Sequence, residues 1–250
     1  MKKVALITGA SSGIGKCLSI GLASHGFHTI MASRDLSKLN AVKSVIDANG
    51  DRSLIVELDI CDENSIRKLY STVSDIGTPD IIINNAGIAI FTPFENRTFD
   101  DFMNVMKINA GGTFLCIQEG SRLMREDKKG GSIINIGSIY GIVSSDPRIY
   151  NKNDRKNAEC YGASKAAIIH MTKYFAVHLA EFDIRVNCIS PGGVFNNQGK
   201  DFVKNYSSRV PMSRMANEDE IADTAIFLSS EDSSYITGQN FAIDGGLTSW

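Results

Sequence analysis

Seven short apolar runs alternate with longer amphipathic stretches along the chain, and this alternation limits its folds more than any other feature. The runs are rich in Ile, Val and Leu, without the two-residue alternation of a strand that has one solvated face. They are Val4–Thr8, His28–Ala32, Leu54–Leu58, Ile81–Asn84, Ser132–Ile136, Arg185–Ile189 and Asn240–Ile243. Continuous runs of this kind are typical of parallel strands that helices cover on both sides.

The stretches between these runs have the apolar spacing of helices. They are about Gly13–His25, Leu36–Ala48, Glu63–Asp75, Phe99–Arg125, Cys160–Glu181 and Glu218–Ser229, with a further short helix around Lys200–Ser207. Strand and helix in regular turn predict an α/β fold, a Rossmann-type doubly wound parallel sheet of about seven strands with helices on both faces. We expect residues 1–250 to form one such domain.

Charge and cysteine usage exclude several classes of protein. The chain has 26 Lys and Arg against 28 Asp and Glu, which gives a net charge of −2 and no broad basic face for nucleic acid or an anionic membrane. Its scattered cysteines lack metal-binding spacing, so we expect free thiols and no metal. They are Cys17, Cys61, Cys116, Cys160 and Cys188. No run approaches the ~20 apolar residues of a membrane span. We expect a cytoplasmic protein.

A glycine-rich turn follows the first predicted strand and opens into the first predicted helix. Glycines allow backbone N–H groups to approach a pyrophosphate, and the helix N-terminus adds a positive dipole end. A phosphate-binding loop of the Walker A type fails here, because Ala10 replaces its first glycine and Cys17 its Mg²⁺-binding hydroxyl. The candidate cofactor-binding residues of this turn are Gly9, Ser11, Ser12, Gly13, Ile14 and Gly15.

The residues after the second predicted strand favour NADP(H), with NAD(H) as the alternative. An NAD-specific turn usually carries a carboxylate ~20 residues after the glycines, where it binds the ribose 2′-hydroxyl. Here Ser33 and Arg34 offer a hydroxyl and a cation, which suit a 2′-phosphate. Asp35 could instead meet the ribose, or it could cap the next helix.

Tyr161 and Lys165 lie one turn apart on a predicted helix, and therefore on the same face. A tyrosine with a pKa of ~10 is a poor acid or base near neutrality, but a neighbouring ammonium group stabilises its phenolate and lowers that pKa. Tyr161 could then exchange a proton with a carbonyl oxygen as a hydride arrives. Because Tyr-x-x-x-Lys is a common pattern, its meaning depends on the motifs around it.

These motifs together resemble the short-chain dehydrogenase/reductase family from end to end. The glycine-rich turn resembles the cofactor turn of the family, and the later motifs follow in the family's order. In chain order they are the pair Asp59 and Ile60, the run Asn84, Asn85, Ala86 and Gly87, the single residues Asn109 and Ser138, the pair Tyr161 and Lys165, the turn residues Pro191, Gly192 and Val194, and the run from Ile243 to Gly246. The resemblance implies a nicotinamide cofactor bound by Asp59, Ile60, Asn85, Ala86, Gly87, Tyr161, Lys165, Pro191, Gly192 and Val194.

The resemblance also implies a catalytic role for four residues. Ser138 would bind the substrate oxygen, and Tyr161 would exchange its proton with that oxygen. Lys165 would lower the pKa of Tyr161 and bind the nicotinamide ribose, while Asn109 would position a water in the proton relay. The implied reaction interconverts a secondary alcohol and a ketone, and the implied assembly is a homotetramer or homodimer that packs the helices Phe99–Arg125 and Cys160–Glu181.

Two segments depart from the family pattern. Ser144–Asn157 is an insertion whose cations could bind an anionic substrate or simply face water; they are Arg148, Lys152, Arg155 and Lys156. After Gly192 comes an amide-rich run that we expect to face the substrate, and such amides suit a polyhydroxylated ligand. It comprises Phe195, Asn196, Asn197 and Gln198. The segment Ser190–Ala216 resembles reductases of bacterial surface-sugar or flagellin-glycan pathways.

Three other functions stay open on the sequence alone. A 3-oxoacyl-carrier-protein reductase would need a basic patch for its acidic carrier. A nucleotide-sugar epimerase or dehydratase also uses Tyr-x-x-x-Lys, but usually has a larger C-terminal domain than Pro191–Met215 can supply. A nucleotide-binding regulator would have no need for the proton-transfer residues.

Overall fold

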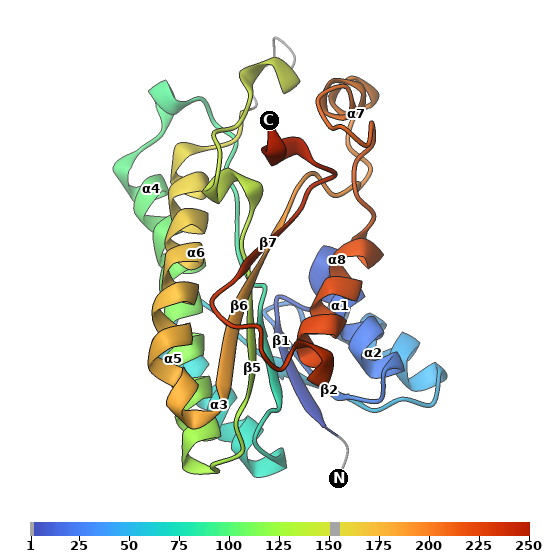
Figure 1. The fold of residues 1–250 in the computed structure, drawn as a ribbon, viewed down its shortest axis with the longest axis vertical. Helices are drawn as coiled ribbons and strands as arrows, with labels where there is room; N and C mark the ends of the chain where they lie inside the picture. The colour runs from blue at the N-terminus through green and yellow to red at the C-terminus, as the bar shows by residue number, and fades with distance from the viewer. Residues whose placement is uncertain (1–2, 151–155) are drawn as a thin grey trace.

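The computed structural model describes residues 3–150 and 156–250, and a seven-stranded parallel sheet forms its centre (Figure 1). The strand order is β3-β2-β1-β4-β5-β6-β7, so the predicted doubly wound sheet is confirmed. The strands are β1 Val4–Thr8, β2 His28–Ser33, β3 Ser53–Glu57, β4 Ile81–Asn84, β5 Gly131–Ile136, β6 Ile184–Pro191 and β7 Asn240–Ile243. Each lies within about two residues of its predicted bounds, the usual uncertainty of strand ends.

Helices cover both faces of the sheet. In Figure 1, α1, α2 and α8 stand on one side of the strands, and α4, α5 and α6 stand on the other. The helices are α1 Gly13–Ser24, α2 Leu36–Ala48, α3 Glu63–Ile76, α4 Phe99–Met106, α5 Gly112–Glu126, α6 Glu159–Leu179, α7 Lys200–Ser207 and α8 Glu218–Ser229. The short helix α7 stands apart from the layers, beyond the carboxyl end of the sheet (Figure 1).

One predicted helix is not continuous. The stretch expected as Phe99–Arg125 forms α4 and α5 with a π-helical turn, Lys107–Gly111, between them. The chain packs closely just after this turn, because a Cβ on Gly112 would lie 2.4 Å from Cγ1 of Ile60. Single π-helical turns inside α-helices are frequent at functional sites.

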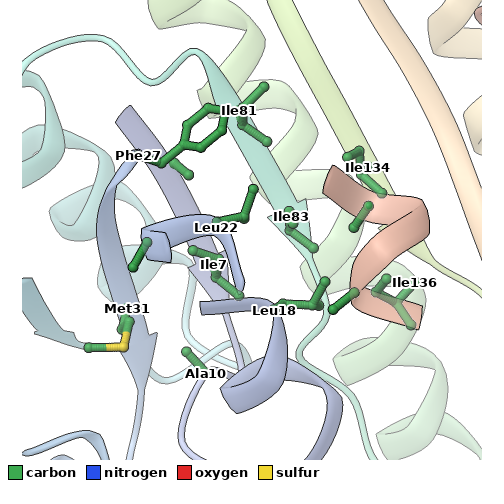
Figure 2. Packing of buried hydrophobic residues seen from close by; sticks show 14 of the residues in the cluster. Ile7, Ala10, Leu18, Leu22, Phe27, Met31, Ile81, Ile83, Ile134 and Ile136 are labelled. Atoms are coloured by element: carbon green, nitrogen blue, oxygen red, sulfur yellow. The ribbon is translucent and has the colours of Figure 1, made fainter. Parts of the chain in front are cut away.

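Two apolar clusters attach the helical layers to the sheet. Figure 2 shows the first, in which Leu18 and Leu22 of α1 pack against strand residues such as Ile7 and Ile83. The second cluster lies on the other face and includes Tyr70, Ile82 and Ile117. Because both faces of each central strand are buried, the apolar runs need no polar alternation.

The strand order reverses direction at β1, which has β2 on one side and β4 on the other. In open α/β sheets, ligands bind outside the carboxyl ends of the strands at such a switch point. Within residues 3–150 and 156–250, no helix is both long and apolar enough to cross a membrane.

Candidate active site

The glycine-rich turn lies at this switch point, between β1 and α1. Gly9 and Gly13 have positive φ angles of 66° and 54°, a conformation that glycine adopts without steric cost. Gly15 is required by close packing, since its Cβ would lie 2.2 Å from the carbonyl oxygen of Gly9 and 2.5 Å from Nδ2 of Asn85. The turn therefore leaves no room for a side chain at Gly15.

The start of α1 offers an anion-binding surface. Ser12 is its extended N-cap residue and makes no side-chain cap, and the first turn contains no acidic residue. Backbone N–H groups at a helix start without a capping side chain bind phosphate oxygens well. A groove of about 510 Å³ begins here, and it is lined by Gly9, Ser11, Ser12, Ile14, Gly15, Ser33, Arg34, Ile60, Asn85, Ala86 and Gly87 among others. These residues fit a dinucleotide.

Arg34 and Lys38 line the far end of this groove, after β2. Asp35 caps α2, because its side chain accepts a hydrogen bond from the Lys38 N–H at 3.0 Å, and it also forms an ion pair with the Lys38 ammonium at 3.2 Å. These contacts lower the pKa of Asp35, the backbone hydrogen bond most of all. Of the two roles that the sequence left open for Asp35, the structure shows the cap.

Asp59 and Asn85 act mainly on the backbone around the groove. The Asp59 carboxylate accepts a hydrogen bond from the Cys61 N–H at 2.9 Å and does not line the groove, whereas its neighbour Ile60 does. Asn85 Nδ2 donates to the carbonyl oxygens of Thr8 and Gly9, at 3.0 and 3.1 Å. Asn85 therefore joins the end of β4 to the glycine-rich turn.

Lys165 is buried, and its ammonium group donates a hydrogen bond to the Ile136 carbonyl oxygen at 2.7 Å. Burial lowers the pKa of Lys165 to about 8. The same group lies near Gly87 and Asn109, since a Cβ on Gly87 would lie 3.7 Å from Lys165 Nζ and 3.1 Å from Asn109 Oδ1. Three residues that are distant in sequence thus meet at one point.

Tyr161 shares this point, with Lys165 Nζ 5.7 Å from the centre of its ring. Burial raises the pKa of Tyr161, while a hydrogen bond with Ser138 partly opposes that rise. The sequence predicted a lowered pKa, and this direction is wrong for the protein alone. The reason is that removing the phenolate from water costs more than the surrounding groups return.

Asn109 lies within the π-helical turn and is fully buried. Its Nδ2 donates to the Ile88 carbonyl oxygen at 2.9 Å and to Ser164 Oγ at 3.0 Å, and its Oδ1 accepts from the Ile88 N–H at 2.8 Å. The side chain therefore connects the loop after β4 with α6. The predicted role of Asn109 in holding a water stays a prediction.

A second cavity of about 490 Å³ opens above Ser138 and Tyr161. A smaller pocket of about 310 Å³ joins it to the groove, because it shares Ile14, Asn85 and Gly87 with the groove and shares Ser138, Tyr161, Gly192 and Val194 with the cavity. The smaller pocket also contains Lys165 and Pro191. The three spaces form one path past Ser138, Tyr161 and Lys165.

Comparison with known proteins identifies the family. The family model described as enoyl-(acyl carrier protein) reductase matches residues 9–248. The chain is 34% identical to trans-4-hydroxycyclohexanecarboxylate dehydrogenase of Sinomonas cyclohexanicum, over 99% of this chain and 93% of that protein. It is 33% identical to 3-oxoacyl-[acyl-carrier-protein] reductase of Synechocystis, over 98% and 96%.

A solved structure agrees with these relatives. The short chain dehydrogenase from Leptospira borgpetersenii with bound NAD+ has a TM-score of 0.90 and 41% identity, covering 99% of this chain and 93% of that one. The chain belongs to the short-chain dehydrogenase/reductase family. It is an NAD(P)-dependent oxidoreductase that acts on CH–OH groups.

In this dehydrogenase/reductase one residue of the amide-rich run, Gln198, lines the cavity, and the other three do not. Phe195, Asn196 and Asn197 are exposed and do not border it, because the chain turns outward through a left-handed residue, Asn197, with φ of 55°. Gln198 does line it, but its Oε1 accepts from the Asn196 N–H and its Nε2 donates to the Val194 carbonyl oxygen. Its amide therefore stabilises the turn.

Two described residues of the insertion, Tyr150 and Asn157, line the cavity. Asp146 pairs with Arg148 at 2.8 Å and with Arg209, which follows α7, at 2.7 Å. Asp146 thus holds Arg148 in place but cannot offset the charge of both arginines, so the contact of Arg148 with an anionic substrate stays a prediction. Lys156 is exposed, and Lys152 and Arg155 lie outside the described residues.

Sequence reasoning missed three tyrosines of the cavity, Tyr140, Tyr150 and Tyr206. They lie before and within the insertion and on α7, where they carry no local motif, and only packing brings them together. The five cysteines are free, as expected. Within the described ranges, no group of three or more His, Cys, Asp or Glu side chains could hold a metal ion.

Proposed function

We propose that this protein is an NADP(H)-dependent reductase and dehydrogenase that interconverts a ketone and a secondary alcohol, with Tyr161 as general acid and base. The observation that supports this proposal most directly is the position of Ser138, Tyr161 and Lys165. All three line the smaller pocket, where the proposed nucleotide groove meets the proposed substrate cavity. A regulator that only bound nucleotide would not need this arrangement. The activity is proposed for one domain spanning residues 1–250.

The bound cofactor would supply or accept the hydride. Ser138 Oγ would donate a hydrogen bond to the substrate oxygen, and the Tyr161 hydroxyl would give that oxygen its proton during reduction. Lys165 would stabilise the resulting phenolate through its ammonium group, which the Ile136 carbonyl holds in place at 2.7 Å. Two hydroxyl donors then polarise the carbonyl without a metal.

NADP(H) is favoured by Arg34, a cation beyond β2. Arg34, Asp35 and Lys38 line the groove there, and the Asp35 carboxylate is paired with the Lys38 ammonium group. A 2′-phosphate would meet the charge of Arg34, while Lys38 offsets the charge of Asp35.

For the substrate we propose a hydroxylated ketone, such as a sugar derivative. Asn157 lines the cavity together with Tyr140 and Tyr150. Amide and phenol groups both donate and accept hydrogen bonds, as the hydroxyls of a polyhydroxylated ligand require.

The alternative is reduction of a 3-oxoacyl thioester, which the name of the Synechocystis relative suggests. That function calls for unpaired cations near the cavity to hold an acidic carrier. Arg148 and Arg209 share the one carboxylate of Asp146, and Lys200 lines the cavity. Because two guanidinium groups carry more positive charge than one carboxylate offsets, this arrangement supports the alternative.

A homotetramer or homodimer is proposed from the apolar surface of the α4–α6 layer. Met103, Phe114, Tyr174 and Val177 are exposed there, and Val177 is 76% exposed. Exposed apolar residues gathered on one layer commonly mark a protein interface.

The test is titration with NADPH and NADH, followed by a screen of cofactor consumption with keto-sugars and acetoacetyl thioesters. We expect tighter binding of NADPH and turnover of a hydroxylated ketone. Turnover of the thioester alone would support the alternative, and binding without any turnover would support the regulator.

A further inference from the structure

Tyr206 connects the helix above the substrate cavity with the turn beside the cofactor pocket. It lies on α7 and is 2% exposed, and its hydroxyl accepts a hydrogen bond from the Gly193 N–H. Gly193 follows Gly192, which lines both the cavity and the smaller pocket. A side chain from α7 therefore holds backbone that borders the proposed site of hydride transfer.

Gly193 is required by this contact rather than by its backbone conformation. Its φ angle is not positive, but its Cβ would lie 2.6 Å from Cζ and 2.7 Å from Cε1 of Tyr206. A Cβ on Gly192 would lie 3.0 Å from the Tyr206 hydroxyl oxygen. The tyrosine ring thus rests directly on the backbone of the turn.

Other backbone contacts also hold this turn. The Gly193 carbonyl oxygen accepts from the Ala216 N–H at 2.9 Å, and the Gly192 N–H donates to the Ile243 carbonyl oxygen at 2.9 Å. Two side chains add to them: Gln198 donates to the Val194 carbonyl oxygen, and Tyr206 attaches the turn to α7. Tyr206 also packs in a small cluster with Ile149. Burial raises the pKa of Tyr206 to about 12, so its hydroxyl stays neutral at ordinary pH.

We propose that Tyr206 is a positioning residue that fixes the Pro191–Val194 turn against the nicotinamide end of the cofactor. The proposal rests on the cofactor site proposed above. Without the Tyr206 hydroxyl, the Gly193 N–H would lose its acceptor and the turn would lose its attachment to α7. The groove that contains Arg34 shares no lining residue with the cavity that contains Tyr206, so the adenosine end of the cofactor would not sense the change.

The experiment compares two ligands in calorimetric titrations of the full chain. NADPH has the nicotinamide, and 2′-phospho-ADP-ribose lacks it. For Tyr206→Phe, which keeps the ring, we expect the Kd of NADPH to rise about tenfold, as a lost buried hydrogen bond predicts. The Kd of 2′-phospho-ADP-ribose should stay within about twofold.

Two further variants complete the test. Gly193→Ala should cause the same selective loss, because its Cβ collides with the Tyr206 ring. Tyr70→Phe removes another buried hydroxyl, in the α3 layer, and should change neither Kd. Equal weakening of both ligands in Tyr206→Phe, or no weakening of either, would overturn the proposal. Failure of the unaltered protein to bind NADPH would instead reject the proposed cofactor.

Discussion

The Lys165 ammonium nitrogen lies 5.7 Å from the centre of the Tyr161 ring, and burial favours the neutral form of both groups. The pKa of Lys165 falls to about 8, while that of Tyr161 rises. The pKa of Lys165 is the lower of the two, so the first proton that the two residues lose leaves near pH 8.

This order predicts how alcohol oxidation depends on pH. Oxidation needs a pair that has already lost one proton, so kcat/KM should rise with pH and level off above an apparent pKa near 8. In Lys165→Arg the guanidinium group stays charged at every pH tested, so the pH profile of kcat/KM should move to higher pH. Stopped-flow measurements from roughly pH 6 to pH 10, a range that lies on both sides of the apparent pKa, would give both profiles. Coincident profiles would remove Lys165 from the titrating pair.

Tyr161→Phe should reduce kcat by at least about a thousandfold, since it removes the proposed acid. The Kd of NADPH should change by no more than a few fold, because the ring and Lys165 remain. Single-turnover kinetics and calorimetry would measure the two quantities. Substantial remaining turnover would show that another group delivers the proton.

Arg34→Asp should shift cofactor preference from NADPH towards NADH by about tenfold or more, because it replaces a cation near the expected 2′-phosphate with a carboxylate. The measurement is the ratio of kcat/KM for the two cofactors. Arg52→Asp makes the same charge change just before β3, at the opposite end of the strands from Arg34, and should leave the ratio unaltered. An unchanged ratio in Arg34→Asp would place recognition elsewhere.

Gly15→Ala should destabilise the glycine-rich turn, because the new Cβ would lie 2.2 Å from backbone that cannot move aside easily. Overpacking of this kind costs about 1–3 kcal/mol, which lowers Tm by several degrees. Gly199→Ala is a matched control, since nothing lies within 4 Å of its Cβ. Thermal unfolding measures both, and equal Tm values would show that the turn relaxes without cost.

Local signals along the chain were enough to predict the sheet. Continuous apolar runs mark the segments that are buried on both faces, and glycine and polar residues at their ends mark where the chain turns. The grouping of Ser138 with Tyr161 and Lys165 was predicted from the family resemblance, because no local pattern links a residue after a strand to residues on a later helix.

Packing between distant segments determined which polar side chains remain available for a ligand. Asn197 turns its segment outward, Asp146 pairs with both Arg148 and Arg209, and the Tyr206 hydroxyl accepts a hydrogen bond from Gly193 on a different element. Each outcome depends on a partner that the folded chain brings into contact, and such a partner leaves no periodic trace in the sequence. Burial likewise sets the direction of the Tyr161 pKa, because the cost of removing charge from water is a property of the folded surroundings.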